Sequence, residues 1–236
     1  MTVILPCWII NEELLQLTKS AIESFGKVEL IIVDNASPLG GGYLRSVASI
    51  YIRNSENLGY AKAVNQGLKL SKTKLTAVAN NDIVVSPNWQ EIVEEIVKNN
   101  IKVGSVHPRM IDYSMPFEYG ASSVLTGKER WCTGSFFVLN RNGNGYQLYN
   151  EKFLNSYDDW DYFKRIRSAG FYTVYTDKAC FRHQHSFSQQ FVLERDENNK
   201  RNAEIFKEMW GDTAENLFTK EFPDQMKQDY REGFNL

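Results

Sequence analysis

Four clusters of acidic and amide side chains follow apolar runs in this chain, and such side chains suit the binding of a metal ion or a phosphate. The clusters are Asp34, Asn57 with Asn65, residues 80–82 (Asn-Asn-Asp) and residues 158–161 (Asp-Asp-Trp-Asp). Residues 75–79 are mostly apolar and β-prone, so Asp82 would lie just beyond the end of a buried strand. Open α/β sheets bind ligands at the carboxyl ends of their strands. We therefore expect Asp82 to hold a divalent cation against a phosphate, and the alternative is an ordinary strand-to-turn sequence.

The elements that must position these clusters alternate between strand and helix in the first 80 residues. We expect strands at residues 2–10, 28–33, 50–53 and 75–80, and helices at 12–25, 43–48 and 61–70. Such alternation predicts an α/β fold with a parallel sheet and right-handed crossovers. Three of the four clusters end parallel strands, so they should gather along one edge of that sheet.

The later part of the chain adds further elements. Ser86 is expected to cap a helix with Pro87 at its first position, and an apolar stripe from Trp89 to Val97 marks that helix as core. Strands are expected at residues 103–106, 131–139 (with Gly134 inside) and 171–175, and helices at 158–169, 203–210 and 214–222. Residues 109–128 are predicted to form a loop or a hairpin, and residues 140–145 a turn-rich break.

Composition excludes several classes of protein. The 236 residues are 42% hydrophobic and 24% charged with a net charge of −2, which gives no reason to expect a nucleic-acid partner. Cys7, Cys132 and Cys180 are odd in number and widely spaced, so we expect reduced thiols in the cytoplasm and no disulfide framework. We expect neither a signal peptide nor a membrane-spanning segment, and peripheral contact with the inner face of a membrane stays open.

The ordered set of motifs resembles glycosyltransferase family 2. The residues that carry the resemblance are 2–6, 33–37, 57–67, 81–82, Gly134, and 158–161 with Arg165. Trp210-Gly211 also resembles the ending of rhamnosyltransferase-like members. The resemblance covers residues 2 to about 188 and implies the GT-A fold, a Rossmann-like and mostly parallel central sheet flanked by helices. We expect this domain over residues 1–193. Residues 194–236, which are polar and charged, would form a small helical extension packed on it.

The resemblance also implies an activity, the inverting transfer of a sugar from a nucleoside diphosphate to a hydroxyl of a glycan or glycolipid acceptor. A UDP- or dTDP-type donor is favoured, together with a divalent cation, Mn²⁺ or Mg²⁺. The family position of Asp34 reads the nucleobase, and a carboxylate can accept a hydrogen bond from the N–H of a base edge. An Asx-turn before Ser37 is the structural alternative. The helix expected to begin near residue 61 has free N–H groups at its N-terminus, and such groups can bind a phosphate. The residues expected at the nucleotide sugar are Pro6, Cys7, Asp34, Asn57, Gly59, Lys62, Asn65 and Asn81.

Metal and catalytic roles follow from the same resemblance. Asp82 is the expected metal acid, and His183 is the expected metal histidine, with His185 as competitor. An inverting transfer is a single displacement, so one carboxylate must take the proton of the acceptor hydroxyl. We expect Asp159 to be this base and place Asp158 second.

Three residues are expected on the acceptor side, Trp131, Gly134 and Asp161. Asp161 and Arg165 lie four residues apart on one predicted helix and can pair. Two structural alternatives stay open here. Asp158 could cap that helix with Asp161 at the third position, and Trp131 could be a core residue.

Two other functions are considered. A sugar-nucleotide nucleotidyltransferase would share a similar sheet, but such enzymes carry a Gly-rich basic loop after the first strand, where this chain has residues 6–11 (Pro-Cys-Trp-Ile-Ile-Asn). A non-catalytic binder of nucleotide sugars is the third hypothesis. It draws on Asn80 and Asn81, since an Asn can give a metal only a neutral carbonyl ligand where family members usually have a second acid.

Overall fold

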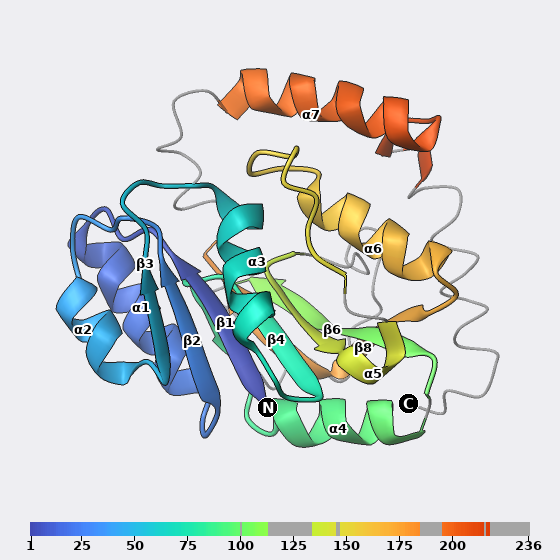
Figure 1. Cartoon of the computed structure of the whole chain (residues 1–236). Coiled ribbons are helices and arrows are strands. Elements are labelled where there is room, and N and C mark those ends of the chain that lie inside the picture. Colours follow the sequence, from blue (N-terminus) through green and yellow to red (C-terminus); the bar gives the residue numbers. More distant parts are fainter. Residues whose placement is uncertain (100, 113–133, 145–146, 185–194, 215, 218–236) are drawn as a thin grey trace.

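The computed structural model describes residues 1–99, 101–112, 134–144, 147–184, 195–214 and 216–217. The strands in this part of the chain are β1 Thr2–Cys7, β2 Glu29–Asp34, β3 Ile50–Arg53, β4 Leu75–Ala79, β5 Ile83–Val85, β6 Val103–Asp112, β7 Phe136–Asn140 and β8 Tyr172–His183. The helices are α1 Glu12–Ser24, α2 Gly41–Val47, α3 Tyr60–Leu70, α4 Trp89–Asn99, α5 Arg141–Asn144, α6 Asp158–Ser168 and α7 Arg195–Trp210. The strands form one sheet in the order β3-β2-β1-β4-β7-β6-β8-β5, with helices on both faces (Figure 1).

The first half of the sheet confirms the predicted parallel arrangement. Strand β1 pairs in parallel with β2 and β4, and β2 pairs in parallel with β3. Cys7, the last residue of β1, lies opposite Asp34, the last residue of β2. The carboxyl ends of these strands therefore meet at one edge, which is where the polar clusters were expected to gather.

The second half of the sheet mixes directions. Strand β7 runs antiparallel to both β4 and β6, β6 and β8 run parallel, and β5 is antiparallel to β8. The α/β class with a mostly parallel sheet is thus confirmed. Within the described ranges, no helix is long and apolar enough to cross a membrane.

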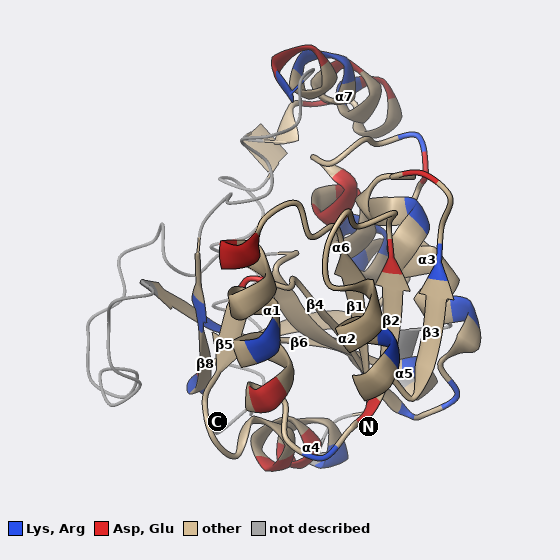
Figure 2. Cartoon of the chain, turned by 90° about the vertical axis from the view of Figure 1, so that its left-hand side faces the viewer, with Lys and Arg blue, Asp and Glu red and all other residues tan. Residues whose placement is uncertain are grey.

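Two apolar layers cover the sheet, because successive side chains of a strand point to opposite faces. On β1, Val3 and Leu5 pack with α1, α2 and α4, whereas Ile4 packs with α3 and α6. Helix α7 lies beyond α6 in Figure 1, and its Phe206 is fully buried in the second layer. Both acidic and basic residues are present on α7 and on α4 (Figure 2).

Local signals explain how α1 begins and ends. The Oδ1 atom of Asn11 accepts a hydrogen bond from the N–H of Leu14 at 2.9 Å, which satisfies one of the free donors of the first turn. Gly26 has a φ of 71°, a left-handed conformation that stops the helix. Both features agree with the sequence-based prediction.

The predicted start of α4 is wrong. The hydroxyl of Ser86 accepts a hydrogen bond from the N–H of Cys180 at 3.0 Å, and the N–H of Ser86 donates to the carbonyl of Cys180. Ser86 therefore continues the pairing of β5 with β8 and does not cap a helix. Asn88 has a φ of 62°, and the helix begins only at Trp89. The apolar stripe that follows is buried as predicted.

Several other boundaries also differ from the predictions. Strand β1 ends three residues early, at Cys7, whereas β6 and β8 extend well past residues 106 and 175 because they pair with each other. Gly134 lies in a turn and β7 begins at Phe136, so Gly134 is not inside a strand. The expected turn-rich break contains the short helix α5, and α7 begins at Arg195, eight residues before the predicted start. The predicted helix at 214–222 falls mostly outside the described residues.

The contact between α3 and β1 generates a stability prediction. A Cβ atom on Gly67 would lie 3.1 Å from Cγ1 of Ile4 and closer still to its Cγ2, so Gly67→Ala forces the helix away from the sheet. We expect a loss of about 1–3 kcal/mol in the free energy of unfolding. Gly42→Ala is the matched control, because Gly42 is also helical and a Cβ there meets nothing within 4 Å. It should leave stability unchanged or raise it by up to about 1 kcal/mol, as measured by urea unfolding. Equal effects of the two substitutions would contradict the packing argument.

Candidate functional site

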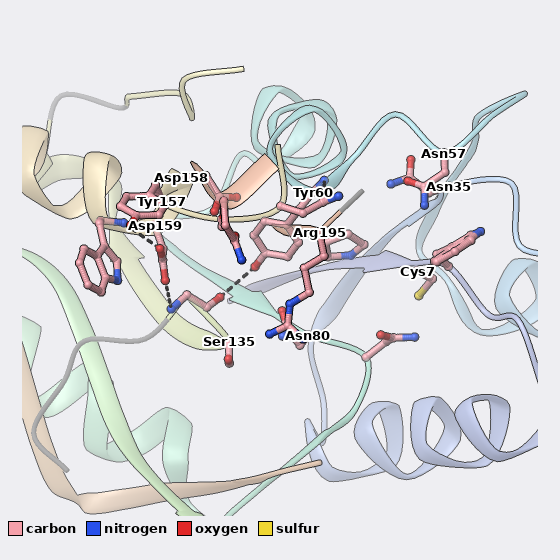
Figure 3. Close-up of a pocket in the computed structure, with 18 residues that line it drawn as sticks. Cys7, Asn35, Asn57, Tyr60, Asn80, Ser135, Tyr157, Asp158, Asp159 and Arg195 are labelled. Atoms are coloured by element: carbon pink, nitrogen blue, oxygen red, sulfur yellow. Dashed lines mark hydrogen bonds between the residues drawn. The ribbon is translucent and has the colours of Figure 1, made fainter. Parts of the chain in front are cut away.

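A cavity of about 540 Å³ opens at the edge of the sheet where the parallel strands end (Figure 3). Each of the four polar clusters, or the residue next to it, contributes to its lining. These lining residues are Asn35, Asn57, Asn80, Asn81, Asp158 and Asp159. The volume lies within the range of roughly 300–1,000 Å³ that is usual for small-molecule sites. The expected convergence of the clusters on one hollow is therefore observed.

Asp159 is held by two backbone donors. Its Oδ2 atom accepts a hydrogen bond from the N–H of Gly134 at 3.1 Å, and its Oδ1 atom accepts one from the N–H of Trp160 at 2.8 Å. A Cβ atom on Gly134 would lie 2.7 Å from Cβ of Asp159. The absence of a side chain at Gly134 is thus what allows the turn before β7 to approach this carboxylate.

The two neighbouring carboxyl groups have different electrostatic environments. Burial raises the pKa of Asp158 from 3.8 to about 8, and the charge of Asp159 adds to that shift. Among the described residues, the Oδ2 atom of Asp158 has no hydrogen-bond partner. Burial raises the pKa of Asp159 too, but the N–H groups of Trp160 and Gly134 oppose this shift by stabilising its charged form. Burial therefore favours the protonated form of Asp158, whereas the two backbone N–H groups favour the charged form of Asp159.

Tyr60 lies close to three of the predicted acidic residues, Asp82, Asp158 and Asp159. Its hydroxyl donates to the carbonyl oxygen of Gly134 at 2.9 Å. Burial raises the pKa of this phenol well above its ordinary value. Three nearby carboxylates raise it further, those of Asp158, Asp159 and Asp82. The expected metal acid and the expected base therefore lie on the same side of the molecule.

Asp82 and His183 are brought together from distant parts of the sequence. The antiparallel pairing of β5 with β8 places the Nε2 atom of His183 3.2 Å from the Oδ1 atom of Asp82. Asn80, which lines the cavity, has its amide nitrogen 3.5 Å from the same imidazole nitrogen. Neither Asp82 nor His183 is itself part of the lining, and His185 falls outside the described residues.

A divalent cation fits this pair of side chains. The described residues contain no group of three or more His, Cys, Asp or Glu side chains that could hold a metal ion. However, Mg²⁺ and similar hard cations are commonly bound through one or two carboxylates together with substrate phosphates and water. The carboxylate of Asp82 and the imidazole of His183 lie next to the lining residues Asn80 and Asn81 and match that pattern, with the remaining ligands left to a diphosphate.

Asp34 lies beside the cavity without lining it. Its Oδ1 atom accepts a hydrogen bond from the N–H of Ser37 at 2.8 Å, and its Oδ2 atom accepts one from the hydroxyl of Tyr51 at 2.6 Å. Arg53 forms an ion pair with the same carboxylate. The bond to Ser37 is the turn that was considered as the alternative, and the neighbouring Asn35 is the residue that reaches the cavity.

The segment before α3 matches its prediction in part. Asn57 lines the cavity and its Oδ1 atom accepts the N–H of Gly59, whose φ is 85°. The first N–H of α3, that of Tyr60, donates to Oδ1 of Asn155 at 3.1 Å. This helix terminus is thus bonded to a side chain that also lines the cavity.

Lys62 and Asn65 do not reach the cavity. Lys62 is exposed on the outside of α3. Asn65 is buried, and its Oδ1 atom accepts the N–H of Tyr149 at 2.7 Å while its Nδ2 atom donates to the carbonyl oxygen of Tyr149 and to Glu151. These hydrogen bonds hold the segment around Tyr149. Asn65 therefore has a structural role here and does not make the predicted contact with a nucleotide sugar.

The three residues expected on the acceptor side differ in where they lie. Gly134 lines the cavity. Asp161 does not, because it is fully buried between Arg165, at 2.8 Å, and the indole N–H of Trp210, at 3.2 Å. The predicted pairing with Arg165 is confirmed. Asp158 is not a helix cap, since Tyr157 precedes α6 as its N-cap residue, and Trp131 lies outside the described residues.

Many lining residues escaped the sequence analysis. Pro6 and Cys7 were expected. Asn80 and Trp160 lie within the predicted clusters, and Ser135 lies in the segment expected on the acceptor side. The residues missed are Trp8, Asn35, Tyr60, Asn155, Ser156, Tyr157, Arg195 and Asn199. Half of them (Trp8, Asn35, Tyr60 and Tyr157) lie next to a predicted residue, so nearness in sequence was a usable signal. Arg195 and Asn199 come from α7, and no local pattern links that helix to the sheet edge. Figure 3 shows the side chain of Arg195 directed into the cavity.

Comparison with known proteins confirms the family that the sequence motifs resemble. A model of the family described as Glycosyl transferase family 2 matches residues 2–173. The chain belongs to glycosyltransferase family 2. Comparison with curated proteins finds no match.

The fold of this family 2 glycosyltransferase is that of solved GT-A enzymes. Residues 1–349 of S. aureus TarS superpose with a TM-score of 0.60 at 12% identity, covering 93% of this chain and 74% of the other. The mannosyltransferase PcManGT from Pyrobaculum calidifontis, in complex with GDP-Man and Mn²⁺, gives a TM-score of 0.61 at 16% identity, covering 96% and 71%. GalNAc-T7 with UDP, GalNAc and Mn²⁺ gives 0.61 at 12% identity, covering 97% and 58%. At these identities the likeness establishes the fold.

The contact between Gly134 and Asp159 predicts an activity defect without a folding defect. Gly134→Ala would push the Asp159 carboxylate away from its position, and a displacement of about 1 Å at a reacting group can cost on the order of 100-fold in rate. We expect a loss of that size in the release of nucleoside diphosphate from a nucleotide sugar, with cooperative thermal unfolding retained. Gly42→Ala serves again as control and should keep full activity. Normal turnover by Gly134→Ala would show that the close approach is unimportant.

The raised pKa of Asp158 predicts how stability depends on pH. Between about pH 4 and 8 the folded protein keeps the Asp158 proton that the unfolded chain has released, so the folded state binds more protons. The free energy of unfolding should therefore fall as pH rises through this window. The slope from this one group is at most about 1.4 kcal/mol per pH unit.

Asp158→Asn removes the titrating group and keeps its shape. Its stability relative to the wild type should increase from pH 5 to pH 8 in urea unfolding experiments. A difference between the two proteins that stays constant over this range would contradict the raised pKa.

Proposed function

We propose that this family 2 glycosyltransferase transfers a sugar from a nucleoside diphosphate to a hydroxyl group of a glycan or glycolipid acceptor, with inversion at the anomeric carbon. The observation that carries the proposal is the placement of Asp159. Its carboxylate lines the cavity and is fixed by two backbone N–H groups that favour its charged form, beside Asp158, whose pKa burial raises to about 8. A single displacement requires one such base to take the proton of the attacking hydroxyl.

The donor end of the cavity supports a nucleotide sugar. Trp8, Asn35 and Asn57 line it where the parallel strands end, and such edges are the usual ligand sites of open α/β sheets. Among the described lining residues, Arg195 is the one with a cationic side chain, and we assign it to the negative charge of the diphosphate. Solved neighbours were crystallised with UDP-GlcNAc and with GDP-Man. We propose a UDP- or dTDP-type donor for this chain.

A divalent cation, Mn²⁺ or Mg²⁺, is part of the proposal. Asp82 and His183 would hold it at the cavity edge, since one carboxylate oxygen and one imidazole nitrogen already face each other there. When bound, the cation neutralises negative charge on the departing nucleoside diphosphate. Two of the solved neighbours contain Mn²⁺.

The wider setting is proposed from the sequence. We place the enzyme in the cytoplasm, with residues 1–193 as the GT-A domain and residues 194–236 as a helical extension packed on it. A glycolipid acceptor would bring it to the inner face of the membrane as a peripheral protein. Free thiols at Cys7 and Cys180 support a reducing compartment.

The decisive experiment compares two neighbouring Asp→Asn substitutions. A thermal-unfolding panel of nucleoside diphosphates and their sugars, with and without Mn²⁺, first selects the donor. Asp159→Asn should then lower kcat by at least about 100-fold, because the base is lost. Asp158→Asn should have a much smaller effect at pH 7, because an amide resembles the carboxyl group that is already protonated there.

Controls separate catalysis from folding. Asp159→Asn keeps only one of its two acceptor oxygens for the N–H groups of Gly134 and Trp160, so thermal unfolding must verify that it folds. Wild-type activity in Asp159→Asn would refute the base assignment. A larger loss in Asp158→Asn would transfer the role to Asp158.

A further inference from the structure

Asn202 on α7 is a buried amide whose hydrogen bonds all go to one loop. It is fully buried, and its Nδ2 atom donates to the carbonyl oxygens of Leu154 and Ser156, both at 3.0 Å, and to the hydroxyl of Ser156 at 2.8 Å. Its Oδ1 atom accepts the N–H of Leu154 at 3.4 Å. A single side chain thus binds backbone groups on both sides of Asn155.

The loop that Asn202 binds has an unfavourable backbone. Asn155 has a φ of 57° and Tyr157 a φ of 64°, both in the left-handed region although neither is glycine. Non-glycine residues persist there only when the surrounding structure fixes them. The hydrogen bonds of Asn202 to Leu154 and Ser156 supply such fixation.

This loop leads directly into the carboxylate pair. Tyr157 is the N-cap residue of α6, so its conformation sets the direction in which Asp158 and Asp159 leave the loop. Asn155 bonds the N–H of Tyr60 through its Oδ1 atom at 3.1 Å. These contacts continue to Asp159. The hydroxyl of Tyr60 donates to the carbonyl oxygen of Gly134, and the N–H of Gly134 donates to the carboxylate of Asp159.

Helix α7 has other attachments that do not depend on Asn202. The ring of Phe206 packs 5.8 Å from that of Tyr157 and 6.4 Å from that of Phe153, measured between centroids. The indole of Trp210 bonds Asp161. A change at Asn202 can therefore loosen the loop while α7 stays docked.

We infer that Asn202 is a positioning residue of the active site, through which α7 holds the loop at residues 154–157 and so places Asp158 and Asp159. The helical extension is then a working part of the transferase and not only a cover for the sheet. The inference rests on the proposed function, because the carboxylates act as base and neighbour there. Asn202 itself does not line the cavity.

The test uses Asn202→Asp and Asn202→Ala in the full chain. Asn202→Asp keeps the side-chain volume but replaces the donating Nδ2 group by an oxygen that faces two carbonyl oxygens. We expect kcat to fall about tenfold or more in both variants, with less than a threefold change in KM for the donor. Glu204→Ala is the matched control on the exposed side of α7 and should behave as wild type.

Hydrogen exchange measured by mass spectrometry supplies a readout that needs no substrate. Peptides covering residues 152–158 should exchange faster in both Asn202 variants than in the wild type or in Glu204→Ala, while peptides of β1 and β2 stay unchanged. If the wild type transfers no sugar, the proposed function fails, and the exchange data still decide whether Asn202 holds the loop.

Two outcomes would overturn the inference. One is an active wild type together with Asn202 variants whose kcat lies within twofold of it. The other is the loss of cooperative thermal unfolding in both variants, which would make Asn202 a residue of global stability and not of local positioning.

Discussion

The hydrogen bond between the backbone of Gly134 and the carboxylate of Asp159 is the interaction on which the site depends. Burial favours a neutral carboxyl group at this position, and a neutral group could not act as the base of the proposed transfer. Two N–H donors shift the balance back toward the charged form. Burial and the charge of Asp159 raise the pKa of the neighbouring Asp158. The backbone thus gives two adjacent carboxyl groups different tendencies to hold a proton.

Much of the fold was predictable because its signals are local. The alternation of apolar strands and amphipathic helices in the first 80 residues specified the parallel half of the sheet, and Asn11 and Gly26 specified the limits of α1. The gathering of polar residues at one edge followed from strand direction alone. The elements that were misjudged depend on partners far along the chain. Ser86, for example, is engaged by Cys180, and no pattern near Ser86 announces that contact.

The same holds for the site: residues in short motifs were predictable, and residues whose partners are distant in sequence were not. The carboxylate pair and the turn at Asn57 were found from short motifs. The contacts of Asn65 with Tyr149 and of Asp161 with Trp210 were not, because such pairings exist only after folding. Arg195 and Asn202 belong to the same group, since α7 reaches the cavity by packing on α6 and not by continuing the sheet.

The pairing of β5 with β8 has a thermodynamic side as well. It joins Asp82 and His183, which are separated by about 100 residues of chain, and the entropy of closing a loop grows with its length. A cation held between them would link these two neighbouring strands at the end of the sheet. Because a ligand that binds only the folded state stabilises it by mass action, the donor complex would be harder to unfold than the empty enzyme. The concentrations of donor and cation would then influence the folded fraction of the enzyme through the same two side chains.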